Sequence, residues 1–509
     1  MVLAMYDFAA KQNFIYKTNK IKEIVGASQL IKDAFNDFFV LLEKEIKLRL
    51  MPIMPTEKDF SMEEFEKDGY NCAVIYEGGG NLFMIFDNAD NCLIANKIFS
   101  RKVYEKTYGL NLVCAYVDVT GDFKHDQHCL YEKSREIKEN TPLLHPVNVL
   151  PFTMIDRNTS LPVVVRKKFE DREQELSRES ELKLEAYEEA KKADSDIGTS
   201  ETELDKLVEK KGSDSLLAVI YIDGNAMGDK VKNLFKENEC VSYEHRTKKL
   251  KEFSNKINTA FQDAPFDAIK KMDEIKKSDG KLWYRKIIGG GDEITIICKA
   301  SVALKIVEKY FEAVKNFKYD DTQQANFSSC AGIAVFHSHD PFSEVYKIAE
   351  QCCESGKKSN REHGNNNFYI DFHFCRSGIT GNLENIRERE EQKYTNRPYC
   401  WHSPANNDEN HNFEKFQNVG RALHAMSKER ARGDVKGLLD SIFEGESYFN
   451  IELERLKTKY GDLPEWQYIN ENNKKEIFDV CLFYDLWFSD KDIENTEGDG
   501  QNAENTNNS

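Results

Sequence analysis

A glycine-rich turn between two apolar runs is the feature of this sequence that most restricts its fold. Residues 283–299 read WYRKIIGGGDEITIICK, with β-branched residues on both sides of the glycines at 289–291. Such runs predict a β-hairpin, because glycine accepts the positive φ angles that tight turns need. Asp292 and Glu293 follow at the turn, where two like charges repel each other. Taken alone, the stretch also fits a surface hairpin with acidic residues for solubility.

The surroundings of this hairpin repeat an earlier part of the chain. The apolar run 216–222 ends in Asp223, and the apolar run at the N-terminus ends in Asp7. A second glycine turn, 78–80, follows Asp7 at a distance similar to that between Asp223 and glycines 289–291. This spacing predicts a duplicated domain.

The two turns differ in their chemistry. We align Asn81 and Leu82 of the first turn with Asp292 and Glu293 of the second. One copy with an acidic turn and one with a neutral turn suggest one active copy and one structural or regulatory copy.

The order of the expected elements predicts the fold class. Over residues 215–375 it is strand, helix, hairpin, helix, strand, helix, strand, which is typical of an α+β sheet of ferredoxin-like or palm type. We expect a first α+β domain at 1–166, a charged solvated helical linker at 167–214, an α+β domain at 215–375, a connecting loop at 376–412, a helical domain at 413–488 and a disordered tail at 489–509.

Composition excludes some functions. The net charge of −17 argues against a protein that coats nucleic acid non-specifically, because phosphate attraction dominates such binding. The sequence contains no run of about 18 apolar residues, so we expect no membrane span. We also see no signal peptide at the start. The twelve cysteines are scattered without a C-x-x-C pair, so we expect reduced thiols in a cytoplasmic protein.

Three carboxylates are the candidate catalytic residues. In the expected fold the first strand and the hairpin are neighbours, so Asp223, Asp292 and Glu293 would meet at one edge of the sheet. There they would repel each other unless a cation neutralised them. Hard oxygen ligands suit Mg²⁺ or Mn²⁺, and a pair of such ions is the usual device for phosphoryl displacement.

Other residues are candidates for nucleotide binding. The glycines of the turn would let a ribose or phosphate lie against the backbone. Asn225 is a candidate for bonding a ribose or base, with a turn-favouring asparagine as the alternative. Basic residues at a helix end would hold the outer phosphates, although each alone is more often an ordinary helix C-terminal charge. The candidates are Gly224, Asn225, Gly290, Gly291, Lys357, Lys358 and Arg361.

These residues carry a resemblance. The chain resembles palm domains of GGDEF-type nucleotide cyclases, and still more the large polymerase-like subunit of type III CRISPR effector complexes. The matching pieces are YIDGNAMG (221–228), GGDE (290–293), AGIAVF (331–336), AEQCCESGKKSNR (349–361), FIYKTNKIKEIVGASQLI (14–31) and EGGGNLFMIF (77–86).

The resemblance implies two ferredoxin-like palm domains, the first degenerate and the second catalytic, followed by a helical domain. It also implies small CRISPR-type subunits, guide or target RNA and palm–palm pairing as partners. The sequence departs from the family at three points. We expect neither the histidine–aspartate nuclease domain nor the zinc cluster of many members, and we interpret His339-Asp340 as a coincidence. The turn reads GGDE where the CRISPR subunit usually has GGDD, which leaves the role of Glu293 open.

The leading hypothesis is an enzyme of antiviral defence that makes linear or cyclic oligoadenylates from ATP with Mg²⁺ or Mn²⁺. Asp223 and Asp292 would hold the metal ions, with Glu293 as a further ligand. The alternative is a catalytically inactive scaffold that binds nucleotide or RNA within a CRISPR-like complex. A dinucleotide cyclase that uses GTP is a third possibility within the same chemistry.

Overall fold

The structure is a computed structural model of mixed α+β class, as predicted. It describes residues 1–51, 59–78, 80–140, 150–169, 172–193, 207–208, 215–234, 242–277, 281–320, 325–364, 366–376, 381–391, 394–403, 411–427 and 431–488. Within these ranges no helix is both long enough and apolar enough to cross a bilayer. The predicted disordered tail at 489–509 lies outside the described residues.

The first part of the chain folds around a four-stranded antiparallel sheet with the strand order β2-β3-β1-β4. Alternate residues of β1 face two different cores, because successive strand side chains point to opposite faces. The elements are β1 (Val2–Ala9), α1 (Lys11–Ile15), α2 (Ile21–Lys44), α3 (Met62–Lys67), β2 (Cys72–Gly78), β3 (Asn81–Phe86), α4 (Ala89–Thr107), β4 (Asn111–Asp118) and α5 (Phe123–Asn140).

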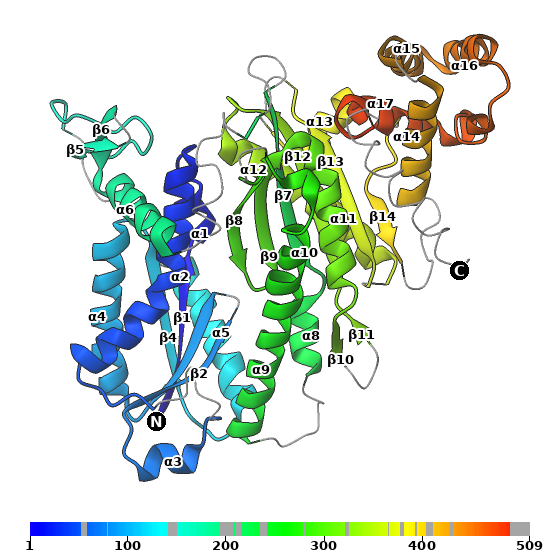
Figure 1. Ribbon diagram of the computed structural model, residues 1–509. Coiled ribbons are helices and arrows are strands. Elements are labelled where there is room, and N and C mark those ends of the chain that lie inside the picture. The colour runs from blue at the N-terminus through cyan, green and yellow to red at the C-terminus, as the bar shows by residue number, and fades with distance from the viewer. Residues whose placement is uncertain are drawn as a thin grey trace, which may run out of the picture.

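The segment predicted as a solvated helical linker is more ordered than its composition indicated. Its described residues contain the end of β5 (Val163–Phe169), the strand β6 (Arg172–Ser177) that pairs with β5, and the helix α6 (Arg178–Ala193), which packs along α2 (Figure 1). Lys183 of α6 is fully buried and donates hydrogen bonds to the Phe14 carbonyl at 2.6 Å and to Glu179 at 2.7 Å. Charge composition did not reveal this packing, because charged side chains such as Lys183 and Glu179 pair with each other in the interior.

The second part contains a six-stranded sheet with the order β14-β13-β12-β7-β9-β8, in which only β12 and β13 run parallel. Its elements are β7 (Leu216–Gly224), α8 (Met227–Asn233), α9 (Tyr243–Ile257), a π-helical turn (Asn258–Asp263), α10 (Ala264–Ile269), β8 (Tyr284–Gly290), β9 (Glu293–Lys299), α11 (Ala303–Val314), β10 (Lys318–Asp320), β11 (Ala325–Asn326), β12 (Ser329–His337), α12 (Phe342–Glu362), β13 (Phe368–Phe374), α13 (Leu383–Glu390) and β14 (Tyr399–His402).

The predicted connecting loop at 376–412 contributes to this sheet. It supplies α13 and the edge strand β14, and its buried Arg397 pairs with Asp479 at 3.0 Å. Asp479 belongs to the C-terminal helices, so the loop ties these helices to the sheet. Polar composition concealed this role, because the charges of the segment are neutralised by buried partners.

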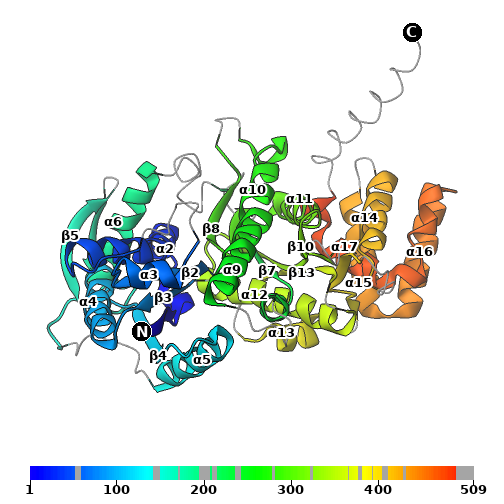
Figure 2. The same ribbon diagram turned by 90° about the horizontal axis from the view of Figure 1, so that it is seen from below.

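Four helices follow and lie beyond the second sheet, on the side away from the first sheet (Figures 1 and 2). They are α14 (Phe413–Ser427), α15 (Ala431–Glu444), α16 (Glu446–Tyr460) and α17 (Lys474–Trp487). Their apolar faces join the core on one side of the six-stranded sheet. The helical content predicted for 413–488 is therefore present.

The two sheets share a topology. The order β8-β9-β7-β12 in the second repeats β2-β3-β1-β4 in the first, with every pair antiparallel. The first strand of each hairpin even carries a register shift at the corresponding place, between Val74 and Tyr76 and between Lys286 and Ile288. This agreement supports the duplication predicted from the sequence.

The register corrects the alignment of the two turns by one position. Gly78 pairs with Asn81, and Gly290 pairs with Glu293. Gly80 therefore takes the place of Asp292, and Asn81 that of Glu293. The sequence comparison went wrong because three glycines in each turn offer no landmark for register.

The two parts pack closely against each other. Alternate residues of β7 face the core beneath α11 and a second core that the first part shares through α1 and α2. At this junction the ring of Tyr16 stacks on Tyr346 of α12 with centroids 3.9 Å apart. Since Asp223 lies two residues after Tyr221, its side chain projects on the face of β7 that looks toward α12 and the first part.

Candidate active site

The end of β7 meets the β8–β9 turn, as the sequence predicted. Ile222 pairs with Ile294, which places Asp223 beside the turn. A Cβ atom on Gly224 would lie 2.8 Å from Oδ2 of Asp292, closer than real Cβ contacts. Gly224 thus permits the approach of the turn carboxylate to the strand end, a role different from the nucleotide binding proposed for it.

The acidic residues of the turn lie where the ionised form is disfavoured. Burial, followed by the charge of Asp223, raises the pKa of Asp292 well above its usual range. Burial, followed by Asp223 and Glu350, also raises the pKa of Glu293. A positive charge placed between these carboxylates would relieve the repulsion.

Lys357 supplies one such charge. It lies on α12 and forms an ion pair with Oδ2 of Asp223. Burial opposes its charged form, but Asp223 outweighs this effect and the pKa of Lys357 is raised. The structure therefore brings Lys357 to Asp223, whereas its predicted contact with the outer phosphates stays a prediction.

Glu350 is an acidic residue that sequence reasoning did not single out. It lies on α12 two helical turns before Lys357, and burial together with the charge of Asp223 raises its pKa. It accepts a hydrogen bond from Gln12 of α1 at 3.4 Å. The signal was present in the sequence, because residues seven apart share one face of a helix.

Asn225 is turned into the protein. Its Nδ2 donates to Oγ of Ser328 at 3.0 Å and to the carbonyl of Asn367 at 2.9 Å, and its Oδ1 accepts from Sγ of Cys330 at 3.2 Å. All these groups are buried, so the amide is satisfied without a ligand. Asn225 ties β12 and the start of β13 to the end of β7, contrary to its predicted contact with a ribose or base.

The other basic candidates lie on the surface. Arg361 is exposed, and its guanidinium pairs with Glu354 at 2.6 Å on the same helix. Lys358 is also exposed. The structure brings neither residue to the carboxylates. Of the three basic candidates, only Lys357 lies on the face of α12 that packs on β7.

Lys230 is a second residue that sequence reasoning missed. It lies on α8, is 5% exposed, and donates a hydrogen bond to the carbonyl of Asn225. Burial lowers its pKa to about 8, while the charge of Asp292 acts in the opposite direction. A buried ammonium thus lies behind the acidic turn, where its charge partly offsets that of Asp292.

The corresponding place in the first part is neutralised by lysines. Asp7 pairs with Lys11 at 2.7 Å and also with Lys138. Lys11 also donates a hydrogen bond to the carbonyl of Gly80 at 3.0 Å. Its charge acts to lower the pKa of Glu293 in the second turn, against the stronger effect of burial. Two ammonium groups therefore neutralise the carboxylate of Asp7.

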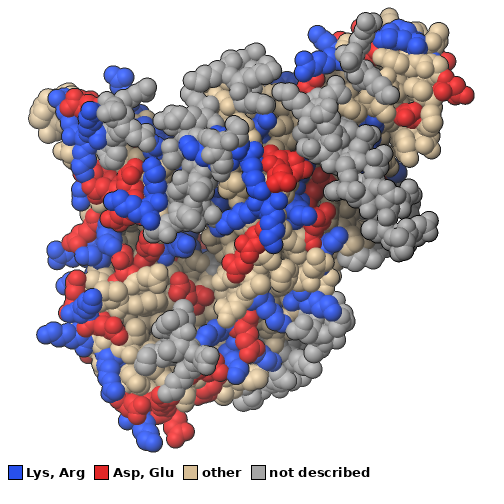
Figure 3. Space-filling model, in the orientation of Figure 1, with Lys and Arg blue, Asp and Glu red and all other residues tan. Residues whose placement is uncertain are grey.

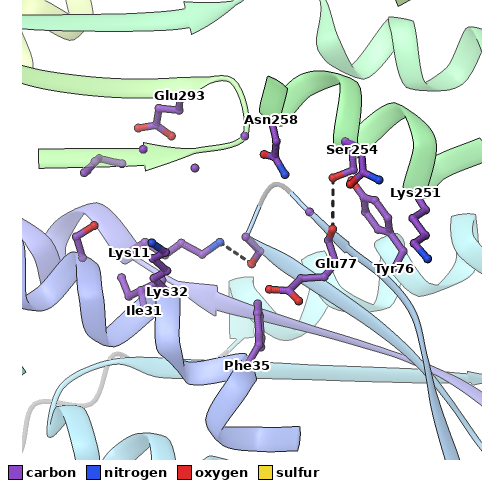
Figure 4. A pocket seen from close by; sticks show the side chains of 18 of the residues that line it. Lys11, Ile31, Lys32, Phe35, Tyr76, Glu77, Lys251, Ser254, Asn258 and Glu293 are labelled. Carbon is purple, nitrogen blue, oxygen red and sulfur yellow. Dashed lines mark hydrogen bonds between the residues drawn. The ribbon is translucent and has the colours of Figure 1, made fainter. Parts of the chain in front are cut away.

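A pocket of about 530 Å³ lies between the two glycine turns (Figure 4). Its walls come from both parts of the chain, including α1, α2 and β2 on one side and α9, β8 and β9 on the other. Gly290 and Gly291 line it beside Glu293, and Lys11, Lys32 and Lys251 add positive charge. Its volume fits a small-molecule ligand, since such sites measure roughly 300–1,000 Å³.

The donor set at the turn fits a cation that takes only part of its ligands from the protein. Within the described ranges no cluster of three or more His, Cys, Asp or Glu side chains is arranged to hold a metal ion. Asp223 is nevertheless close enough to Asp292 for its charge to disfavour the ionised form of Asp292. Mg²⁺ is commonly bound by one or two carboxylates, with water and substrate phosphates completing the shell.

Comparison with known proteins finds a sequence family that matches much of the second part of the chain. Residues 216–367 match the sequence family described as Cas10/Cmr2, second palm domain. This range begins at β7 and includes both Asp223 and the acidic turn. No curated protein sequence matches the chain.

Solved structures agree with this fold. Csm1 in T. onnurineus is 12% identical with a TM-score of 0.52, covering 95% of this chain and 69% of that one. A Csm1–Csm4 cassette in complex with pppApA gives the same values. In a cassette in complex with AMPPNP, at 12% identity and a TM-score of 0.44, the match covers 72% of this chain and 54% of that chain, about half its length.

Proposed function

We propose that this Cas10-like chain, whose residues 216–367 match the Cas10/Cmr2 second palm domain, joins nucleoside triphosphates into linear or cyclic oligonucleotide signals. The expected substrate is ATP and the setting is antiviral defence. The observation that carries the proposal is the meeting of Asp223 and Asp292 across Gly224, beside a pocket of nucleotide size.

The reaction that suits this arrangement is attack by a ribose hydroxyl of one nucleotide on the α-phosphorus of another. The new oxygen–phosphorus bond forms as the bond to the β-phosphate breaks, pyrophosphate leaves and the hydroxyl loses its proton. One or two Mg²⁺ or Mn²⁺ ions held by Asp223 and Asp292 would neutralise the phosphates and activate the hydroxyl. Glu293, which lines the pocket, is proposed as a further ligand.

Lys357 and the glycines have supporting roles in the proposal. Lys357 balances the charge of Asp223 in the free protein and is close enough to the site to meet a triphosphate instead. Gly290 and Gly291 expose backbone to the pocket, so a phosphate or ribose can lie against the turn. Arg361 would need to leave Glu354 to take part.

The first sheet is proposed to be a degenerate palm. Its strand order supports this, and Asp7, the counterpart of Asp223, is already paired with Lys11 and Lys138. We further propose association with a small CRISPR-type subunit and with guide or target RNA, and contact between palms. The first of these rests on the similarity to a Csm1–Csm4 cassette.

A catalytically inactive scaffold remains the second candidate. The observation that favours it is the ion pair of Asp223 with Lys357, which neutralises one of the two carboxylates that a metal ion would use. A scaffold would bind nucleotide or RNA without releasing pyrophosphate.

The test is turnover with Mg²⁺ or Mn²⁺ and each nucleoside triphosphate, with and without RNA. We expect pyrophosphate and oligonucleotide products by mass spectrometry. Asp292→Asn should lower the rate at least 100-fold, whereas Asp273→Asn, at a side chain that is 94% exposed, should leave it unchanged. Nucleotide binding without product under every condition would favour the scaffold.

A further inference from the structure

Glu77 projects into the pocket from the glycine turn of the first part, opposite Glu293 (Figure 4). It lies on β2 just after the register shift at Val74–Tyr76, and such shifts re-aim the side chains that follow them. Its carbonyl accepts a hydrogen bond from Oγ of Ser254 at 3.4 Å. The backbone of Glu77 is therefore anchored to α9 of the second part while its side chain faces the cavity.

The carboxylate of Glu77 has no hydrogen-bond or ion-pair partner among the residues that the structure describes. Burial raises its pKa, and no nearby cation lowers it again. Its surroundings in the pocket include the apolar side chains of Ile31, Phe35 and Ile75. A half-buried carboxylate that lacks a partner costs free energy, so a ligand that donates hydrogen bonds to it would gain affinity.

The two sides of the pocket differ in character. One carries Glu293, Gly290 and Gly291 of the acidic turn, where the phosphates of the proposed substrate would lie. The other carries Glu77 with Phe35 below it (Figure 4). An apolar wall with one hydrogen-bond acceptor suits the flat face and donor-bearing edge of a nucleobase better than it suits a phosphate, which Glu77 would repel.

We propose that Glu77 selects the base of the nucleotide in this pocket by accepting hydrogen bonds from the N–H groups of a purine. Adenine offers its 6-amino group, and guanine offers N1–H together with its 2-amino group. Uracil offers one ring N–H between two carbonyl oxygens that the carboxylate repels. The inference rests on the proposed nucleotide chemistry for the identity of the ligand, but it does not require turnover.

The experiment uses pairs of nucleotides that differ by one donor. Binding of ATP is compared with that of purine riboside triphosphate, which lacks the 6-amino group, and GTP with ITP, which lacks the 2-amino group. Calorimetry on the full chain carrying Asp292→Asn avoids turnover. A hydrogen bond to a charged group contributes roughly 1.5–3 kcal/mol, so we expect at least one pair to differ about tenfold or more in Kd.

Adding Glu77→Ala should reduce that difference to less than about twofold, and Glu77→Gln, which keeps one acceptor, should give an intermediate value. Glu66→Gln, at an exposed position of α3, is the matched control and should preserve the preference. The pair that responds shows whether the base is adenine or guanine. A preference unchanged by Glu77→Ala, or no binding of any purine nucleotide at millimolar concentration, would overturn the inference.

The same variants separate this inference from the proposed function. Pyrophosphate release that keeps its base preference in Glu77→Ala would refute the role of Glu77 and leave nucleotidyl transfer standing. If a chain with intact Asp292 forms no product but shows a base preference that depends on Glu77, nucleotidyl transfer is refuted and the role of Glu77 stands.

Discussion

Gly224 sets the distance between the two carboxylates that the proposed reaction requires. An alanine here would place its Cβ 2.8 Å from Oδ2 and 2.9 Å from Cβ of Asp292, so the turn would have to move. We expect Gly224→Ala to lower turnover at least tenfold and to cost about 1–3 kcal/mol of stability. Gly228→Ala is the control, since a Cβ there meets nothing within 4 Å. Pyrophosphate release and thermal unfolding measure both effects, and equal activities would contradict the proposed geometry.

Lys357 and Lys358 form a natural pair for testing the basic end of α12. Only Lys357 reaches Asp223, and Lys358 is exposed. Lys357→Met leaves Asp223 without its partner and should lower kcat/KM for the triphosphate at least tenfold, mostly through KM if Lys357 meets the outer phosphates. Lys358→Met should change it less than about twofold. Steady-state kinetics over a range of ATP concentrations separates the two, and equal effects would mean that long-range charge alone is responsible.

At the scale of elements, α11 is linked to the C-terminal helices by a half-buried acid, Glu308. Oε1 of Glu308 accepts a hydrogen bond from Nε2 of Gln417 on α14 at 2.5 Å, and burial raises the pKa of Glu308 to about 7. In the unfolded chain the value is about 4.3. The folded state therefore holds the proton longer, and the free energy of unfolding falls as the pH rises between these values.

Glu308→Gln should remove this fall. Its stability relative to the unmodified chain should grow from pH 5 to pH 8, by up to about 3 kcal/mol. Urea unfolding at several pH values measures the difference. Glu454→Gln, whose side chain is 72% exposed, should show no such trend. A difference that is constant with pH would mean that Glu308 is ionised throughout.

Short-range patterns predicted the elements around the site better than the contacts between them. The continuous apolar run of β7 and the glycine turn placed Asp223 and Asp292 together because a strand and its neighbouring hairpin leave few arrangements. Asn225 was misassigned because its partners, Ser328 and Asn367, are more than 100 residues away. The buried lysines of α6 and α8 were missed because composition does not reveal which charges find partners.

At the scale of the whole molecule, the acidic net charge is dispersed. On the face shown in Figure 3, basic and acidic side chains are interspersed across both parts of the chain. Binding of a polyanion would thus depend on local groups of basic residues, such as Lys11, Lys32 and Lys251 in the pocket. The electrostatic field of the whole protein would not attract it. The pocket itself lies where α1, α2 and β2 of the first part meet α9, β8 and β9 of the second.

The junction between these sheets should make the chain unfold as one unit. Tyr16 is 7% exposed, stacks on Tyr346 and donates a hydrogen bond to Oγ1 of Thr295 at 3.5 Å. All four tryptophans lie after residue 280, so their fluorescence reports the second part and the C-terminal helices, whereas circular dichroism reports the whole chain. In the unmodified protein both signals should change at the same urea concentration.

Tyr16→Ala removes the stacked ring and should cost about 3–5 kcal/mol, as for other large aromatic side chains. Because this loss weakens the first part and its junction, the circular dichroism signal should begin to change before the fluorescence does. Tyr131→Ala, at a position of α5 that is 45% exposed, should leave the two transitions together. If the signals stay coincident in Tyr16→Ala as well, the shared core and not this ring couples the two sheets, since that core would hold them together after the stack is lost.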